Sequence, residues 1–161
     1  QTTHLGEFKM KIIDGLHEET ILTDLKSNDK KGVLEELSAP MEKITGISHN
    51  VLVKVLLERE RLGSTGIGDG IGIPHGKLND LDNLILGFGL SQKGVNFDSL
   101  DGRPTHIFFL LFTPENSTGL HLKLLARISK ILKNDAIKKK LLNAANKDEV
   151  FSILKEEDEN L

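Results

Sequence analysis

Residues 106–112 read His-Ile-Phe-Phe-Leu-Leu-Phe, and six large apolar side chains in succession restrict the possible folds. The run ends before Pro114, so it has the length of one β-strand and is far too short to span a membrane. A strand without polar alternation is typical of a sheet that is covered on both faces. The sequence therefore predicts a buried central strand between layers of other elements.

Helical patterns precede the strand-rich middle of the chain. Apolar residues at helical spacing predict a helix from Asp29 that Pro40 interrupts. Ser48 is a suitable N-cap for the next helix, which we expect to stop at Gly63. These helices stand before the predicted strands rather than alternating with them, unlike the order in a doubly wound sheet.

Three more helical patterns follow the strands, the first of them opening near His121. We expect Asp135 and Asp148 to cap the last two helices and the acidic residues 156–159 to be frayed. No repeat or Pro- or Ser-rich linker divides the chain. The predicted fold class is α/β, a single domain with a mixed β-sheet sandwiched between α-helices.

The first residues receive no functional weight. Met10 followed by Lys-Ile-Ile resembles a natural start, so we interpret residues 1–9 as a remnant added to the natural chain and residues 10–161 as the domain.

Composition excludes several functions. The chain has no cysteine, which rules out disulfides, thiolate metal sites and a thiol nucleophile. Aromatic residues make up 4% and the net charge is -3, so base-stacking platforms and a basic patch are missing and nucleic acid is not an expected partner. No apolar window is long enough for membrane insertion, and a cytoplasmic location is expected by default.

The most unusual segment reads GIGDGIGIPHGK over residues 66–77. Its glycines resemble nucleotide-binding loops, but G-x-G-x-x-G between a strand and a helix and the G-K-[S/T] ending are both missing. The isoleucines alternate as in an extended segment held against the core. The segment is therefore interpreted as an ordered loop that carries one imidazole, that of His75.

A neutral imidazole offers a nitrogen lone pair near pH 7. Attack by that nitrogen on phosphorus would give a phosphohistidine, which can pass its phosphoryl group to another nucleophile. Glycines leave room for the incoming group, and backbone N–H groups can neutralise its charge. His75 can equally be an ordinary surface histidine beside a flexible loop, although the ordered isoleucines argue against this.

Other polar residues have both a functional and a plain structural interpretation. His121 can project toward the loop from a helix start, and either Arg59 or Arg61 can fold back on phosphoryl oxygens. Lys77 is interpreted as a rim charge and His106 as a structural histidine. The histidine spacing does not indicate zinc, and no metal or organic cofactor is expected.

The stretch from Leu57 to Lys77, LERERLGSTGIGDGIGIPHGK, closely resembles the enzyme IIA domains of the fructose/mannitol type. These domains belong to the bacterial phosphoenolpyruvate-dependent sugar phosphotransferase system (PTS) and include a nitrogen-related branch. The resemblance extends over almost the whole chain. One departure is Gly72, where the family usually has alanine, and the missing methyl is expected to loosen the loop slightly.

The resemblance implies a role for three residues. His75 would accept a phosphoryl group from an HPr-like carrier and pass it to a cysteine of an enzyme IIB partner, with His121 and Arg59 supporting the phosphoryl site. Arg61 is then interpreted as a solvated residue at the helix end.

Two uses of such a phosphohistidine stay open, a regulatory signal of the nitrogen-related type and a dedicated IIA subunit of a fructose or mannitol permease. Regulation is favoured, because the stretch from Leu62 to Gly68 resembles the nitrogen-related branch. A hydrolase that uses His75 and His121 as acid and base lacks a nucleophile or a carboxylate pair at suitable spacing.

Overall fold

The computed structural model describes residues 11–161, and the interpretation of residues 1–9 as a remnant lies outside this range. One mixed sheet of six strands has the order β1-β5-β6-β3-β2, with β4 also paired to β6. The strands are β1 (Leu16–Leu22), β2 (Gly66–Gly68), β3 (Ile71–Gly72), β4 (His75–Leu78), β5 (Ile85–Val95) and β6 (Thr105–Pro114). The predicted α/β class with a mixed sheet is confirmed.

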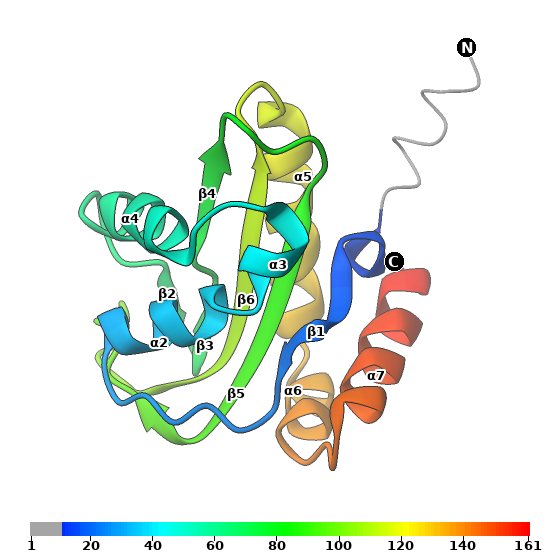
Figure 1. Ribbon diagram of the computed structural model, residues 1–161. Helices are drawn as coiled ribbons and strands as arrows, with labels where there is room; N and C mark the ends of the chain where they lie inside the picture. Colours follow the sequence, from blue (N-terminus) through cyan, green and yellow to red (C-terminus); the bar gives the residue numbers. More distant parts are fainter. Residues whose placement is uncertain (1–10) are drawn as a thin grey trace.

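Helices cover both faces of the sheet (Figure 1). One face carries α2 (Lys30–Ser38), α3 (Met41–Thr45) and α4 (His49–Glu60), and the other carries α5 (Thr118–Leu132), α6 (Asp135–Leu142) and α7 (Lys147–Glu159). A short 3-10 helix, η1 (Ile12–Asp14), precedes β1. The result is a three-layer sandwich.

Strand β6 is the centre of this sandwich, as its apolar run predicts. Alternate side chains point to opposite faces of a strand. Ile107, Phe109 and Leu111 accordingly lie in the core under α5, α6 and α7, whereas Phe108, Leu110 and Phe112 lie in the core under α2, α3 and α4. Because all six are fully or almost fully buried, the run needs no polar alternation.

Several boundaries follow the sequence signals. Pro40 separates α2 from α3, and the Ser48 hydroxyl accepts a hydrogen bond from the Asn50 N–H at the start of α4. Helix α4 ends at Glu60, three residues before Gly63. The glycine-rich segment is not one loop but three short strands.

The expected caps Asp135 and Asp148 are wrong. The N-caps are Asn134, whose amide oxygen accepts from Ala136 and Ile137, and Asn146, which accepts from Glu149. An Asn side chain caps as well as Asp, and here it stands one or two positions earlier. The two aspartates lie in the first turns instead, where their charge suits the helix dipole.

The acidic tail is also not frayed, since α7 continues to Glu159. Asp158 is fully buried and pairs with Arg127 of α5, whose guanidinium bonds both its carboxylate and its carbonyl oxygen. Its second carboxylate oxygen accepts from the Ile13 N–H at 3.3 Å. This network holds the end of α7 to α5 and η1.

The helices do not all precede the strands, because β1 comes first. Its register shifts between Leu16, opposite Leu86, and Ile21, opposite Phe88, so extra residues bulge out. The hydroxyl of Thr20 closes this bulge by donating a hydrogen bond to the Leu86 carbonyl at 2.7 Å. The bulge breaks the alternating pattern by which a strand is recognised from sequence.

Candidate functional site

The glycine-rich segment crosses one edge of the sheet. Asp69 and Gly70, both with positive φ, form the two-residue turn between β2 and β3. Strands β3 and β4 then pair with successive parts of β6, and Ile73 and Pro74 join them. The segment is therefore ordered, as its isoleucines predict, and His75 stands at the first position of β4.

Glycine is required where α4 packs closely on this edge. A Cβ atom on Gly76 would lie 2.6 Å from Cγ1 of Val55 in α4, too close for any side chain. Gly72 is buried, and a methyl there would lie 3.2 Å from Cγ2 of Thr105. The expectation that Gly72 loosens the loop stays a prediction, because a methyl there would fit only if Thr105 or Phe108 shifted by a few tenths of an ångström.

The structure brings His75, His121 and Arg59 together. The two imidazole rings lie 5.2 Å apart between centroids, inclined by 61°. Nε of Arg59 donates to Nε2 of His75 at 3.3 Å. His75 comes from β4, His121 from the first turn of α5 and Arg59 from the last turn of α4, so the site joins both helical layers at the sheet edge (Figure 1).

Hydrogen bonds fix the tautomer of His75. Its Nδ1 lies 2.7 Å from the Ile73 carbonyl oxygen, which can only accept, so Nδ1 carries the proton. Burial, and secondarily the positive charge of Arg59, lower the pKa of His75 below 6.5, although the Ile73 carbonyl and Glu60 oppose this. At neutral pH the ring is uncharged, and Nε2 carries the lone pair.

His121 is buried rather than on the helix surface. Its Nδ1 lies 2.6 Å from the hydroxyl of Thr113, which has no other hydrogen-bond partner among the described residues. Because a buried hydroxyl proton needs an acceptor, Thr113 donates to Nδ1 and leaves the ring proton on Nε2. Burial, followed by the charges of His75, Lys77 and Arg59, lowers the pKa of His121 to about 4.

A cavity of about 390 Å³ opens over these groups. Beyond the three site residues, it is lined by Val55, Glu58, Leu62, Gly76 and Lys77. Lys77 lies at the rim, as predicted, where its amine donates to the Thr118 hydroxyl at 2.9 Å. Leu62 is 84% exposed, and Leu122, next to His121 in α5, is 61% exposed. Leu62, which lines the cavity, gives its opening an apolar border.

The other residues considered from the sequence lie apart from this cluster. Arg61 is exposed, and His106 is held by a hydrogen bond from Nδ1 to the Ser91 carbonyl at 2.8 Å, as a structural histidine should be. Thr113 was not predicted. It lies two residues beyond Leu111 on the same face of β6, so period-two alternation does place it toward α5.

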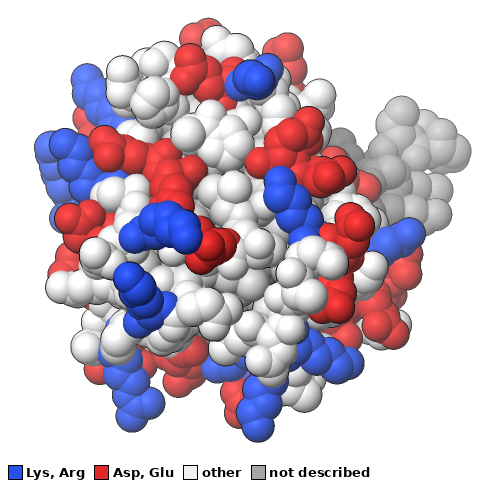
Figure 2. Space-filling model, turned by 60° about the horizontal axis from the view of Figure 1, so that its bottom comes forward, with Lys and Arg blue, Asp and Glu red and all other residues white. Residues whose placement is uncertain are grey.

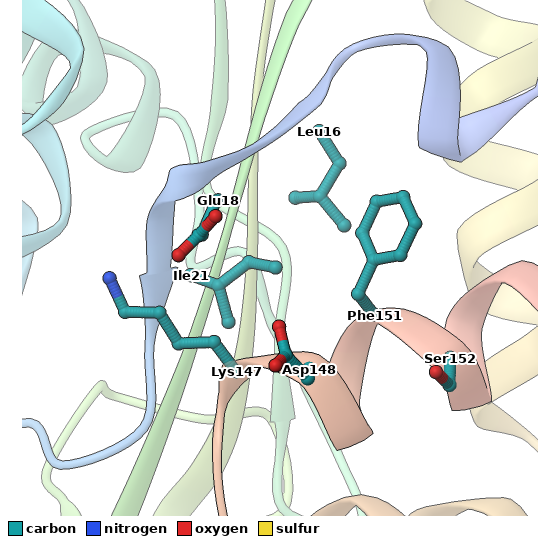
Figure 3. A pocket seen from close by; sticks show the side chains of 7 residues that line it. All are labelled: Leu16, Glu18, Ile21, Lys147, Asp148, Phe151 and Ser152. Atoms are coloured by element: carbon teal, nitrogen blue, oxygen red, sulfur yellow. The ribbon is translucent and has the colours of Figure 1, made fainter.

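A larger cavity of about 490 Å³ lies between β1 and α7 (Figure 3). The side chains of Leu16, Ile21 and Phe151 form its apolar part, and the other lining residues are Glu18, Lys147, Asp148 and Ser152. None of these offers an imidazole or a guanidinium. The cavity over His75 is therefore the candidate active site.

Metal-binding groups form no competing site in residues 11–161, and one face of the molecule (Figure 2) shows no basic patch. On the face seen in Figure 2, acidic and basic side chains alternate with uncharged surface and form no continuous basic field. No group of three or more metal-ligating side chains is found among the described residues. Nor is any helix in this range long and apolar enough to cross a membrane.

The fold and this site define an open-sheet α/β domain that presents one neutral, half-buried imidazole at a sheet edge. The chain belongs to the EIIA 2 family of the phosphoenolpyruvate-dependent sugar phosphotransferase system, whose family model matches residues 15–157. The predicted resemblance is confirmed.

Individual relatives come from both branches of the family. A nitrogen regulatory protein of Bradyrhizobium diazoefficiens is 41% identical over 90% of this chain and 95% of its own length. The fructose-specific EIIABC component of Bacillus subtilis is 36% identical over 92% of this chain, which corresponds to 24% of that longer protein.

Solved structures agree with the fold. The nitrogen regulatory protein IIA-Ntr from Neisseria meningitidis matches with a TM-score of 0.84 and 33% identity, over 88% of this chain and 97% of that one. Enzyme IIA of the Escherichia coli mannitol system, solved in complex with phosphorylated enzyme IIB, matches with a TM-score of 0.73 and 20% identity, over 86% and 95% of the two chains.

Proposed function

We propose that this protein is a phosphoryl carrier that accepts a phosphoryl group on Nε2 of His75. The observation that carries the proposal is the hydrogen bond from Nδ1–H to the Ile73 carbonyl, because it leaves the lone pair on Nε2, where Arg59 meets it at the cavity that both residues line. A lowered pKa keeps that lone pair available at neutral pH.

In the accepting step, the Nε2 lone pair attacks phosphorus in line with the bond to the donor nitrogen. The new N–P bond forms while the old one breaks, and its electron pair returns to the donor's imidazole. In the donating step a cysteine thiolate attacks phosphorus, and the electron pair of the N–P bond returns to Nε2. Neither step requires a metal or an organic cofactor to balance.

The site residues have separate tasks in this transfer. Arg59 leaves Nε2 as the phosphoryl group arrives and pairs with its oxygens, a task that suits the guanidinium fork. His121 donates from Nε2–H to a phosphoryl oxygen. The Ile73 carbonyl keeps the Nδ1 proton while the ring gains positive character. Transfer of this kind depends on positioning and charge stabilisation.

The donor in this proposal is an HPr-like phosphocarrier, and the acceptor is an enzyme IIB cysteine or a regulated target protein. The exposed side chain of Leu62, which lines the cavity, supports docking by a protein, since apolar anchors next to a charged centre are common in interfaces. The similarity to nitrogen regulatory proteins over nearly their full length favours regulatory use. The predicted cytoplasmic location is part of the same proposal.

Incubation with phosphoenolpyruvate, enzyme I and HPr, followed by intact-mass measurement, tests the proposal. The wild type should gain one phosphoryl group and His75→Ala none. An equal gain in both proteins would exclude His75.

A further inference from the structure

We propose that Glu60 is a positioning residue for phosphoryl transfer, which acts through the Thr65 backbone to hold His75 in its reactive tautomer. Glu60 follows Arg59 directly but points the other way, into the protein, and only 4% of its side chain is exposed. Among the described residues, no side-chain hydrogen bond joins Glu60 to His75, His121 or Arg59. The inference rests on the proposed function for its effect on rate.

The carboxylate of Glu60 is fully engaged. Oε1 accepts from the Thr65 N–H at 3.0 Å and from the Lys30 amine at 2.8 Å, and Oε2 accepts from the Thr65 hydroxyl. The Lys30 side chain is itself only 17% exposed and lies 4.8 Å over the Phe97 ring. A buried carboxylate is costly unless it is paired and hydrogen-bonded, so these contacts define one position for Thr65.

From Thr65 a chain of hydrogen bonds leads to the imidazole. The Thr65 carbonyl accepts from the Ile73 N–H at 3.0 Å, and the Ile73 carbonyl accepts from His75 Nδ1 at 2.7 Å. The carbonyl that selects the His75 tautomer is thus linked to the Glu60 carboxylate through two residues, Ile73 and Thr65.

The same contacts also fix Arg59. Its Nη1 donates to the Gly63 carbonyl at 2.9 Å, within the turn that joins α4 to Thr65. Glu60 holds the far end of that turn through Thr65. Arg59 and Glu60 therefore hold one turn from two sides, and the guanidinium reaches His75 only while the turn keeps its place.

The deciding experiment compares Glu60→Ala with Glu60→Gln by ¹⁵N NMR of the unphosphorylated imidazoles and by transfer kinetics from phosphorylated HPr. In Glu60→Ala we expect His75 to lose its single Nδ1–H tautomer. The kcat should fall by at least about ten-fold, while KM for HPr changes little. Glu60→Gln keeps an acceptor for the Thr65 N–H and should restore most of both properties.

Two further variants keep the test decisive. If Glu60→Ala does not fold, the double variant Lys30→Met/Glu60→Leu replaces it, because it removes both buried charges together. This folded protein should also lose the single Nδ1–H tautomer of His75. Glu35→Gln, an exposed acid on α2, is the control for simple charge loss.

A folded Glu60→Ala variant with the wild-type His75 spectrum and rate would overturn the inference. So would a Glu60→Gln variant as impaired as Glu60→Ala, because the charge rather than the position would then matter. The tautomer measurement needs no phosphoryl donor, so it separates failure of this inference from failure of the carrier function.

Discussion

Nε of Arg59 donates to Nε2 of His75 across 3.3 Å, so in the resting protein the guanidinium occupies the nitrogen proposed to accept the phosphoryl group. In the proposed mechanism the same contact keeps the positive charge beside the incoming phosphoryl oxygens. Arg59 is thus placed to exchange one partner, the lone pair, for another, the phosphoryl group, without moving far.

Replacing Arg59 by Gln should lower the rate of phosphoryl transfer about 10² to 10³-fold, because one preorganised charged donor is lost from the transition state. Arg61→Gln is the matched control, since Arg61 is exposed two residues further on. Rapid-quench kinetics with phosphorylated HPr measure both. A near-wild-type rate in Arg59→Gln, or an equal loss in Arg61→Gln, would show that the contact with Nε2 has no role in transfer.

Thr113 should hold His121 in its donor tautomer. In Thr113→Val, which keeps the shape but lacks the hydroxyl, Nδ1 of His121 loses its only described partner. The stability should fall by about 1 kcal/mol and the transfer rate by a few-fold. Thr113→Ser keeps the hydroxyl and should behave like the wild type. Imidazole ¹⁵N shifts of His121 that are identical in all three proteins would exclude this role.

Stability should fall as the pH is lowered from 6.5 toward 4. His121 has its pKa lowered from 6.5 to about 4 in the folded protein, so in this range the unfolded chain binds a proton that the native protein does not. The loss should be of the order of 1–3 kcal/mol for this group, and it is absent above pH 6.5.

Urea unfolding of the wild type and of His121→Gln, at about pH 7 and about pH 5, measures this effect. The Gln variant should lose less stability between the two conditions, because it lacks the titrating ring. The same loss in both proteins would assign the pH dependence to other groups.

Asp158→Ala should destabilise the protein by about 3 kcal/mol, because it leaves the Arg127 guanidinium without its buried carboxylate. Glu159→Ala, an exposed acid in the same turn, should have almost no effect. Thermal unfolding compares them, and phosphoryl acceptance should stay unchanged in both. Equal melting temperatures for the two variants would mean that the end of α7 is frayed after all.

The central strand and the ordered glycine-rich segment could be predicted from sequence because each rests on a local pattern. Six apolar residues up to Phe112 permit only a covered strand, and the isoleucines around Gly72 indicate an extended chain. His75 stands out within that pattern. The functional roles predicted for His121 and Arg59 come from the family resemblance. Spacing alone leaves each of them with a plain structural interpretation as well.

The features that were missed depend on contacts between distant residues. Asp158 is pinned by Arg127, 31 residues away, and the β1 bulge is closed by Thr20 on Leu86, 66 residues away. In the sequence, Glu60 belongs to a helix end with alternating charges. Only the structure shows that its carboxylate accepts a hydrogen bond from the Lys30 amine. Composition and periodicity carry no signal for such pairings.

The position of the phosphoryl group on His75 tests the central claim most directly. Protein labelled with ¹⁵N-histidine is phosphorylated through enzyme I and HPr, and the imidazole nitrogens are followed by NMR. The proposed mechanism predicts that Nε2 of His75 shifts and couples to phosphorus while Nδ1 keeps its proton. A phosphoryl group on Nδ1 of His75, or on any other side chain, would contradict it.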